Sequence, residues 1–176
     1  MPPLLARLHT PNEMAFGADE EFLYFCDGDN NRVRRVRYNV GSGAFRGNVE
    51  TVVGSGSEDP LGAEIPETAR RLPISFPYGL AFSPNFQYLY VTETFGFSRI
   101  YRVEVRQNLA DSRVCRIAGA VTFGAAGDGD DAVNAQFTNP NSMQIDAAGN
   151  IYILDGRNHR LRKFFPVDAL CSSENP

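Results

Sequence analysis

The 176-residue chain is 43% hydrophobic, which is enough to bury the core of one ordinary domain. Its net charge of −4 gives no general preference for nucleic acid or an anionic membrane, so any basic binding surface must be local. No run of 18 apolar residues is present, which excludes a membrane-spanning helix.

The cysteines bear on the cellular setting. Cys26, Cys115 and Cys171 show no C-x-x-C spacing and are odd in number, so neither a disulfide framework nor a zinc site is indicated. This cysteine usage favours an intracellular, reducing environment.

One pattern occurs three times along the chain, each time starting at a proline. The prolines Pro11, Pro77 and Pro140 lie 66 and 63 residues apart. A short apolar run begins three residues after each proline, and a strand-like segment with a central tyrosine follows it. Self-similarity at a fixed period predicts a repeat architecture.

The first repeat predicts strands at 14–16 and 23–25, a turn at 27–28, a basic strand at 32–36 and a fourth strand at 49–53. The turn holds Asp-Gly, a pair that accepts the backbone angles of tight reversals.

The second repeat predicts the same elements at 80–82, 89–91, 100–103 and 113–117. A long segment, 54–76, precedes it, and we expect one short helical turn within 66–72.

The third repeat predicts strands at 143–145, 151–153 and 160–164, joined by turns at 148–150 and 155–156. A second long segment, 118–139, precedes this repeat, and the tail at 166–176 offers little for a fourth strand.

These elements predict an all-β fold, a partial β-propeller of about three four-stranded antiparallel blades in an incomplete ring. The blades span approximately 11–56, 77–119 and 140–165 in a single segment. Propellers close with four to eight blades, so three outcomes stay open. The chain is a fragment of a longer propeller, or half of a ring completed by another copy or another protein, or an open arc held in a large assembly.

Two stretches carry a family resemblance. Residues 127–164, GDGDDAVNAQFTNPNSMQIDAAGNIYILDGRNHRLRKF, resemble an NHL repeat. Residues 76–105, FPYGLAFSPNFQYLYVTETFGFSRIYRVEV, are similar to blades of SMP-30/gluconolactonase and strictosidine-synthase-like propellers. Those families are described as six-bladed, and the lactonase type holds a divalent metal on its axis.

Three acid–arginine pairs recur at the hairpins of the repeats and are interpreted as structural. Opposite charges across a hairpin stabilise the reversal by about 1 kcal/mol or less. The pairs are Asp27 with Arg32, Glu93 with Arg99, and Asp155 with Arg160.

Metal ligands are a weaker hypothesis. Asp27 and Asp29 share the D-x-D-x-N spacing that starts a calcium loop, but Arg32 and Tyr38 stand where an EF-hand requires glycine and glutamate. The lactonase resemblance implies an asparagine after the repeat proline. Asn12 and Asn141 follow that pattern and Tyr78 does not. Calcium is therefore the only cofactor candidate, and no catalytic residue is assigned.

The two long segments are candidate partner-binding loops, since long loops in compact domains are usually functional or disordered. The apolar and acidic positions considered are Leu61, Ile65, Phe76, Phe123, Asp128 and Asp130. These side chains could equally lie against their own blades.

Basic third strands raise a further alternative, RNA binding. The two clusters are Arg32, Arg34, Arg35 and Arg37, and Arg157, Arg160, Arg162 and Lys163. Strand alternation separates neighbouring arginines onto opposite faces, so solvated edge arginines are the preferred interpretation.

The sequence therefore predicts a non-catalytic NHL-type propeller segment that acts as a protein-interaction scaffold in a larger protein or assembly. A part of a metal-dependent lactonase-like hydrolase is the alternative, and an RNA-binding surface is third. The partner is another protein or additional blades, with a homo-oligomer among the options.

Overall fold

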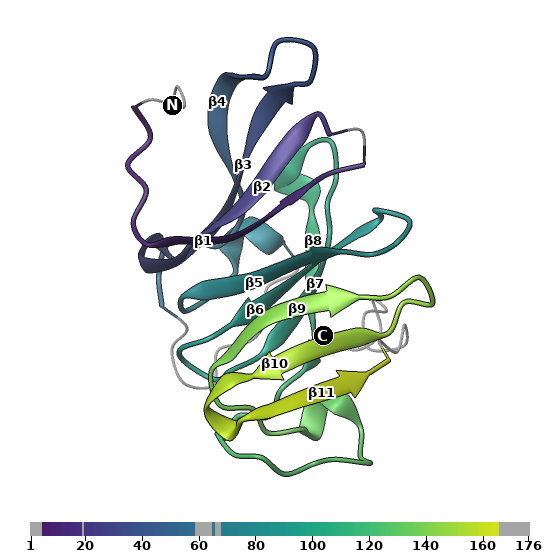
Figure 1. Cartoon of the computed structure of the whole chain (residues 1–176). Coiled ribbons are helices and arrows are strands. Elements are labelled where there is room, and N and C mark those ends of the chain that lie inside the picture. Colours follow the sequence, from purple (N-terminus) through teal and green to yellow (C-terminus); the bar gives the residue numbers. More distant parts are fainter. Residues whose placement is uncertain (1–4, 19, 59–64, 66–67, 166–176) are drawn as a thin grey trace.

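The computed structural model describes residues 5–18, 20–58, 65 and 68–165, which form three antiparallel β-sheets arranged one beside the next (Figure 1). The first sheet has the order β1-β2-β3-β4 and the second β5-β6-β7-β8. The third has the order β11-β10-β9. Each sheet is one blade of a partial β-propeller, as the sequence predicts.

The strand bounds follow the three sequence repeats. Blade 1 holds β1 (Pro11–Phe16), β2 (Phe22–Asp27), β3 (Arg32–Asn39) and β4 (Ala44–Val53). Blade 2 holds β5 (Pro77–Phe82), β6 (Tyr88–Glu93), β7 (Ile100–Glu104) and β8 (Arg113–Ala118). Blade 3 holds β9 (Pro140–Ile145), β10 (Ile151–Asp155) and β11 (Arg160–Phe164).

Short 3-10 turns shape the hairpins and the segments between blades. In blades 1 and 3 the turn after the acidic residue is η2 (Gly28–Asn30) or η6 (Gly156–Asn158), and each ends at a residue with left-handed backbone angles. The remaining turns are η3 (Ala69–Arg71), η4 (Leu109–Asp111) and η5 (Ala132–Asn134). The turn η3 is the short helical turn expected within 66–72.

The inner strands of the blades lie next to one another, with β5 between β1 and β9 (Figure 1). Gly79 permits this approach, because a Cβ at that position would lie 2.2 Å from the carbonyl oxygen of Asn141. Beyond β5, Ser142 Oγ donates a hydrogen bond of 2.8 Å to Glu13 Oε2, which links blade 3 directly to blade 1.

Two apolar cores fill the spaces between the blades. The first core joins residues of blade 1, including Cys26 and Val33, to residues of blade 2 such as Leu89. The second joins Ile100 of blade 2 to Ile151 and other residues of blade 3. Because side chains alternate along a strand, every blade presents one set of residues to the blade before it and another to the blade after it. We call these its front face and its rear face.

Among the described cysteines, Cys26 is free and buried, whereas Cys115 is disulfide-bonded. This differs from the sequence interpretation, in which no disulfide was indicated, and removes the cysteine argument for a reducing environment. Burial, with a smaller contribution from the charges of Glu13 and Asp27, raises the pKa of the Cys26 thiol.

Within the described part of the chain, no helix is long and apolar enough to cross a membrane.

Candidate functional site

Each blade contains one fully buried carboxylate at the end of its second strand: Asp27, Glu93 and Asp155. One oxygen of each accepts a hydrogen bond from a backbone N–H two residues before the proline of the same blade. The distances are 2.8 Å from His9, 2.9 Å from Ser75 and 2.8 Å from Thr138. The carboxylate therefore holds the segment entering a blade against that blade's hairpin.

The second oxygen of each carboxylate faces the third strand. Asp27 Oδ2 lies 3.1 Å from Arg34 Nε. The equivalent position holds Tyr101 in blade 2, whose hydroxyl lies 3.4 Å from Glu93 Oε2. In blade 3, Arg162 Nη1 lies 3.8 Å from Asp155 Oδ2. These contacts give the acidic residues a structural role in all three copies.

The arginines paired with these acids in the sequence analysis lie directly across the hairpins. Arg32 is the Cα partner of Asp27, and Arg160 that of Asp155. Glu93 N–H donates to the Arg99 carbonyl at 2.8 Å. The Arg32 guanidinium extends over the turn to the carbonyls of Asn30 and Ser55. Partial burial and the charge of Arg34 lower the pKa of Arg32.

A repeated hydrogen bond joins each blade to the next. Asn31 Oδ1 accepts from Phe76 N–H at 3.0 Å, which links blade 1 to blade 2. Ser98 Oγ accepts from Asn139 N–H at 3.2 Å, which links blade 2 to blade 3. All four residues have left-handed backbone angles, and both donors directly precede the proline of their blade. We call this contact the interblade hook.

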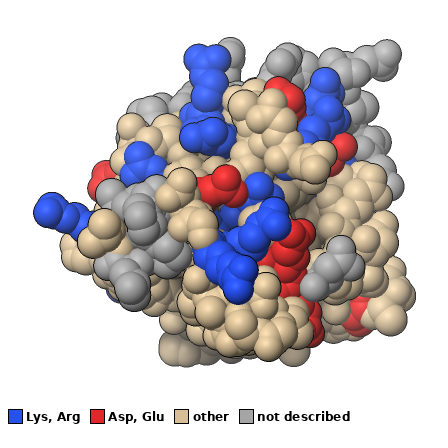
Figure 2. All heavy atoms as spheres, turned by 90° about the horizontal axis from the view of Figure 1, so that it is seen from above, with Lys and Arg blue, Asp and Glu red and all other residues tan. Residues whose placement is uncertain are grey.

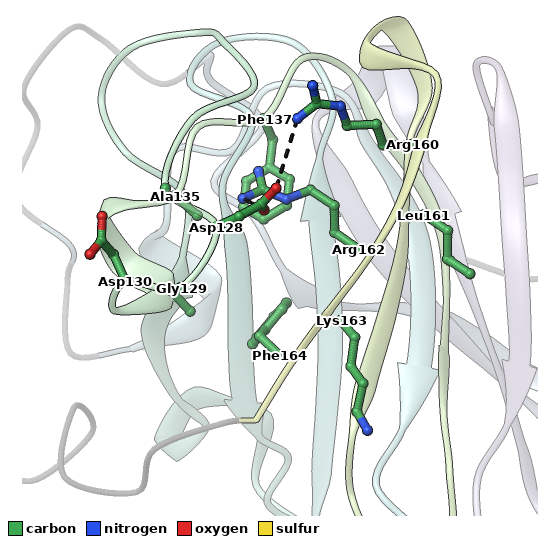
Figure 3. Close-up of a pocket in the computed structure, with 12 residues that line it drawn as sticks. Asp128, Gly129, Asp130, Ala135, Phe137, Arg160, Leu161, Arg162, Lys163 and Phe164 are labelled. Carbon is green, nitrogen blue, oxygen red and sulfur yellow. Dashed lines mark hydrogen bonds and ion pairs between the residues drawn. The ribbon is translucent and has the colours of Figure 1, made fainter.

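A hollow of about 660 Å³ lies between β11 and the segment that enters blade 3 (Figure 3). Phe164 points into it, and Asp128 pairs with Arg162 at 2.5 Å (Figure 3). Arg162 also stacks on Phe137, with 4.7 Å between the guanidinium carbon and the ring centroid. Leu161 points to the opposite side of β11 (Figure 3).

In the part of the chain that the structure describes, both outer faces of the arc expose apolar side chains. On the front face of blade 1, Met14 is 63% exposed, whereas the equivalent Leu80 and Met143 are 3% and 1% exposed. On the rear face of blade 3, Leu154 and Leu161 are 51% and 66% exposed. Their equivalents in the first two blades are fully buried, namely Cys26, Thr92, Val33 and Ile100.

The predicted metal ligands contact the hairpins or entering segments of their own blades. Asp27 accepts from His9 N–H and Asn30 Nδ2 and pairs with Arg34, while Asp29 accepts from Thr10 Oγ1 and lies 3.6 Å from His9 Nε2. Asn12 and Asn141 fold back onto the hairpin glycines of their own blades, where added Cβ atoms would lie 2.9 and 2.7 Å from the amide nitrogens. In the described residues there is no cluster of three or more His, Cys, Asp or Glu side chains suited to a metal.

The basic strands are largely neutralised by acidic neighbours. Figure 2 looks down on the end of the arc that holds β3 and β4, and shows Lys and Arg side chains gathered beside acidic ones. Besides Arg34, Arg35 pairs with Glu50 at 2.8 Å and Arg37 with Glu21 at 2.6 Å. Arg35 and Arg162 are buried, which differs from the expectation of solvated edge arginines.

The candidate partner-binding loops divide between core and surface. Ile65 packs against the first core, and Phe76 contacts the rings of Tyr78 and Phe95. Phe123 is exposed. Asp128 pairs with Arg160 and Arg162, and Asp130 is an exposed residue that lines the hollow. Leu61 lies outside the described residues.

Sequence reasoning missed the interblade hook, and although an open stack of blades predicts exposed apolar faces, it did not name the residues of the rear face of blade 3. The signal for the face was present, since Leu154 and Leu161 align with apolar or small side chains of the other repeats. The hook carries no shared residue type, because asparagine and serine both supply the acceptor.

Comparison with known proteins agrees with this geometry. Residues 137–164 match the NHL repeat. A search of curated protein sequences gave no match.

Solved structures resemble the fold at low sequence identity. An auxiliary nutrient binding protein from Bacteroides thetaiotaomicron superposes with a TM-score of 0.64 and 17% identity, over 85% of this chain and 36% of that one. The periplasmic gluconolactonase of Pseudomonas aeruginosa superposes with a TM-score of 0.55 and 16% identity, over 92% and 36%. This chain therefore spans little more than a third of the length of either protein, and the likeness concerns the fold alone.

Proposed function

Because the chain is a partial β-propeller with an NHL repeat in its third blade, we propose that it is a non-catalytic platform that binds protein within a larger protein or assembly. One observation carries this proposal. The apolar residues Met14, Leu154 and Leu161 stand on blade faces whose equivalents are buried between blades.

Burial of these faces gives the driving force for association. Removing a large apolar side chain from water contributes about 1.5–3 kcal/mol, and three such residues lie at the two ends of the arc. Exposed apolar surface beside unpaired strand edges favours contact with another protein surface. The edge strand β11 lies beside Leu154 of β10, so apolar contact and strand pairing are available at the same end.

The alternative, a part of a lactonase-like hydrolase, is favoured by the structural likeness to the gluconolactonase. In the described residues, however, the side chains Asp27, Asn12 and Asn141 hold hairpins or pack against them, as the contacts above describe.

Native size fractionation of the tagged protein tests the platform. The double variant Leu154→Glu/Leu161→Glu is compared with the control Val40→Glu/Phe86→Glu, which changes two exposed apolar residues in turns between strands, outside the candidate partner-binding loops. We expect the face variant to leave the large fractions and the control to stay in them. Equal behaviour of the two variants contradicts the proposal.

An activity assay tests the non-catalytic part. The purified protein is incubated with a gluconolactone and Ca²⁺, Mg²⁺ or Zn²⁺, and we expect hydrolysis at the uncatalysed rate. Metal-dependent turnover by the purified protein would support the hydrolase instead.

A further inference from the structure

We infer that the rear face of blade 3 binds the front face of blade 1 of a second copy of this chain, and that two copies close one ring. The inference rests on the proposed function and names the partner of the same surfaces. Both halves of the required interface are present in this chain, and the two existing interblade contacts show how they would fit.

The first half is the rear face of blade 3, formed by Tyr152, Leu154, Leu161 and Lys163. In the other blades the same positions hold an aromatic residue, two apolar or small residues and an arginine, all buried. They are Tyr24, Cys26, Val33 and Arg35 in blade 1, and Tyr90, Thr92, Ile100 and Arg102 in blade 2. The residue types of the third set therefore match those of two faces that already cover a neighbouring blade.

The acceptor of the interblade hook is also present. His159 ends its 3-10 turn with φ 53°, as Asn31 does with φ 51° and Ser98 with φ 52°. Neutral imidazole carries one nitrogen that accepts a hydrogen bond, so His159 can replace the amide and hydroxyl oxygens used in the first two blades. The His159 side chain is exposed.

The second half is the front face of blade 1. Thr10 has φ 49° and directly precedes Pro11, so it is equivalent to the hook donors Phe76 and Asn139. No acceptor for the Thr10 N–H lies among the described residues. Beside it, the exposed Met14 and the half-buried Leu23 and Phe25 occupy positions that are buried in blades 2 and 3.

A rear face that meets a front face makes a head-to-tail contact, which either closes or continues indefinitely. Three blades joined to three blades give six, a number within the range in which propellers close. The closed ring contains two identical interfaces related by a two-fold axis, each with one hook between His159 and the partner copy's Thr10.

Sedimentation velocity of the purified chain tests the inference. We expect twice the monomer mass of 19.4 kDa for the wild type. Leu161→Glu and Met14→Glu each remove both interfaces, so each variant alone should be monomeric. Because both side chains are exposed in one copy, neither change should lower the melting temperature of the monomer.

Mixing the two variants distinguishes this arrangement from any self-complementary contact. A Leu161→Glu chain retains its front face and a Met14→Glu chain retains its rear face, so the mixture should recover a dimer with one intact interface. His159→Ala should weaken dimerisation about thirtyfold, since each of two interfaces loses one hydrogen bond. His159→Asn restores the acceptor found at Asn31 and should recover most of the affinity.

A wild type that stays monomeric at high concentration overturns the inference, as does a mixture that fails to associate. The proposed function would survive that result if the fractionation above still depended on Leu154 and Leu161. The proposed function would be contradicted, independently of the dimer, if the Leu154→Glu/Leu161→Glu variant fractionated like its control.

Discussion

Substitution of the buried carboxylate of blade 1 tests quantitatively whether that residue holds the entering segment against the hairpin. Asp27 accepts hydrogen bonds of 2.8 Å from His9 N–H and from Asn30 Nδ2, and pairs with Arg34 Nε at 3.1 Å. Replacing Asp27 with alanine leaves the His9 N–H and the Arg34 guanidinium without their partner, at a site where the Asp27 side chain is fully buried.

The size of the effect follows from these contacts. Breaking a buried ion pair by removing one partner costs about 3–5 kcal/mol, and a stranded neutral donor costs about 1–3 kcal/mol. The Arg34 side chain is 20% exposed, so water recovers part of this loss. We expect Asp27→Ala to lower the free energy of unfolding by about 3–4 kcal/mol, a large share of a typical 5–15 kcal/mol.

Asp29→Ala is the matched control, because it removes the same charge from the same hairpin. The Asp29 side chain is 38% exposed, and its side-chain partners within the described residues, His9 and Thr10, are exposed, so its removal should lower the free energy of unfolding by less than about 1 kcal/mol. Urea unfolding followed by circular dichroism measures both variants. Equal losses in the two variants would refute the assignment of Asp27 as the residue that holds the entering segment.

Three further predictions concern single residues. Gly54→Ala should lower the free energy of unfolding by at least about 2 kcal/mol more than Gly47→Ala in the same urea assay. Both glycines have positive φ, but only a Cβ at Gly54 would meet a backbone atom, the carbonyl oxygen of Asn31 at 2.3 Å. Equal costs would exclude that close approach. Cys26 should resist alkylation in the native protein at pH 8 and react after denaturation, because burial raises its pKa, and rapid native labelling would contradict its position. Hydrogen bonds, first that from the Asn150 side chain, lower the pKa of Asp146, so its contribution to stability is present above its ordinary pKa of about 3.9 and disappears as the pH falls through the lowered value. A carboxyl titration by NMR should show that lowered midpoint and its return toward 3.9 in Asn150→Ala; a midpoint that ignores the substitution would contradict the cause.

Much of the fold could be predicted because each repeat places its proline, tyrosine, acid and arginine at one register. The Cα register of the hairpins, Asp27 opposite Arg32 and Asp155 opposite Arg160, follows from that spacing. The side-chain partner could not be read in the same way. The carboxylates meet the residue two positions after that arginine: in blade 1 Arg32 extends over the turn to backbone carbonyls, and Arg34 lies beside Asp27.

The contacts between distant segments were beyond sequence reasoning. The bond from His9 N–H to Asp27 and the hook from Phe76 to Asn31 use backbone donors, which have no sequence signature. The disulfide at Cys115 was also missed, because spacing alone does not define a pairing. By contrast, the apolar character of Leu154 and Leu161 can be read from the sequence, but only the comparison of the three blades shows that their equivalents are buried while these two are exposed.

Covalent surface labelling of Met14, Leu154 and Leu161 tests the central claim most directly. The protein is labelled once as a dilute purified chain and once in the assembly isolated from its natural source, with the exposed Val40 of the β3–β4 turn as the internal reference. We predict that labelling of all three residues falls sharply in the assembly while that of Val40 does not. Unchanged labelling at both ends of the arc would show that these faces are not where the protein meets its partners.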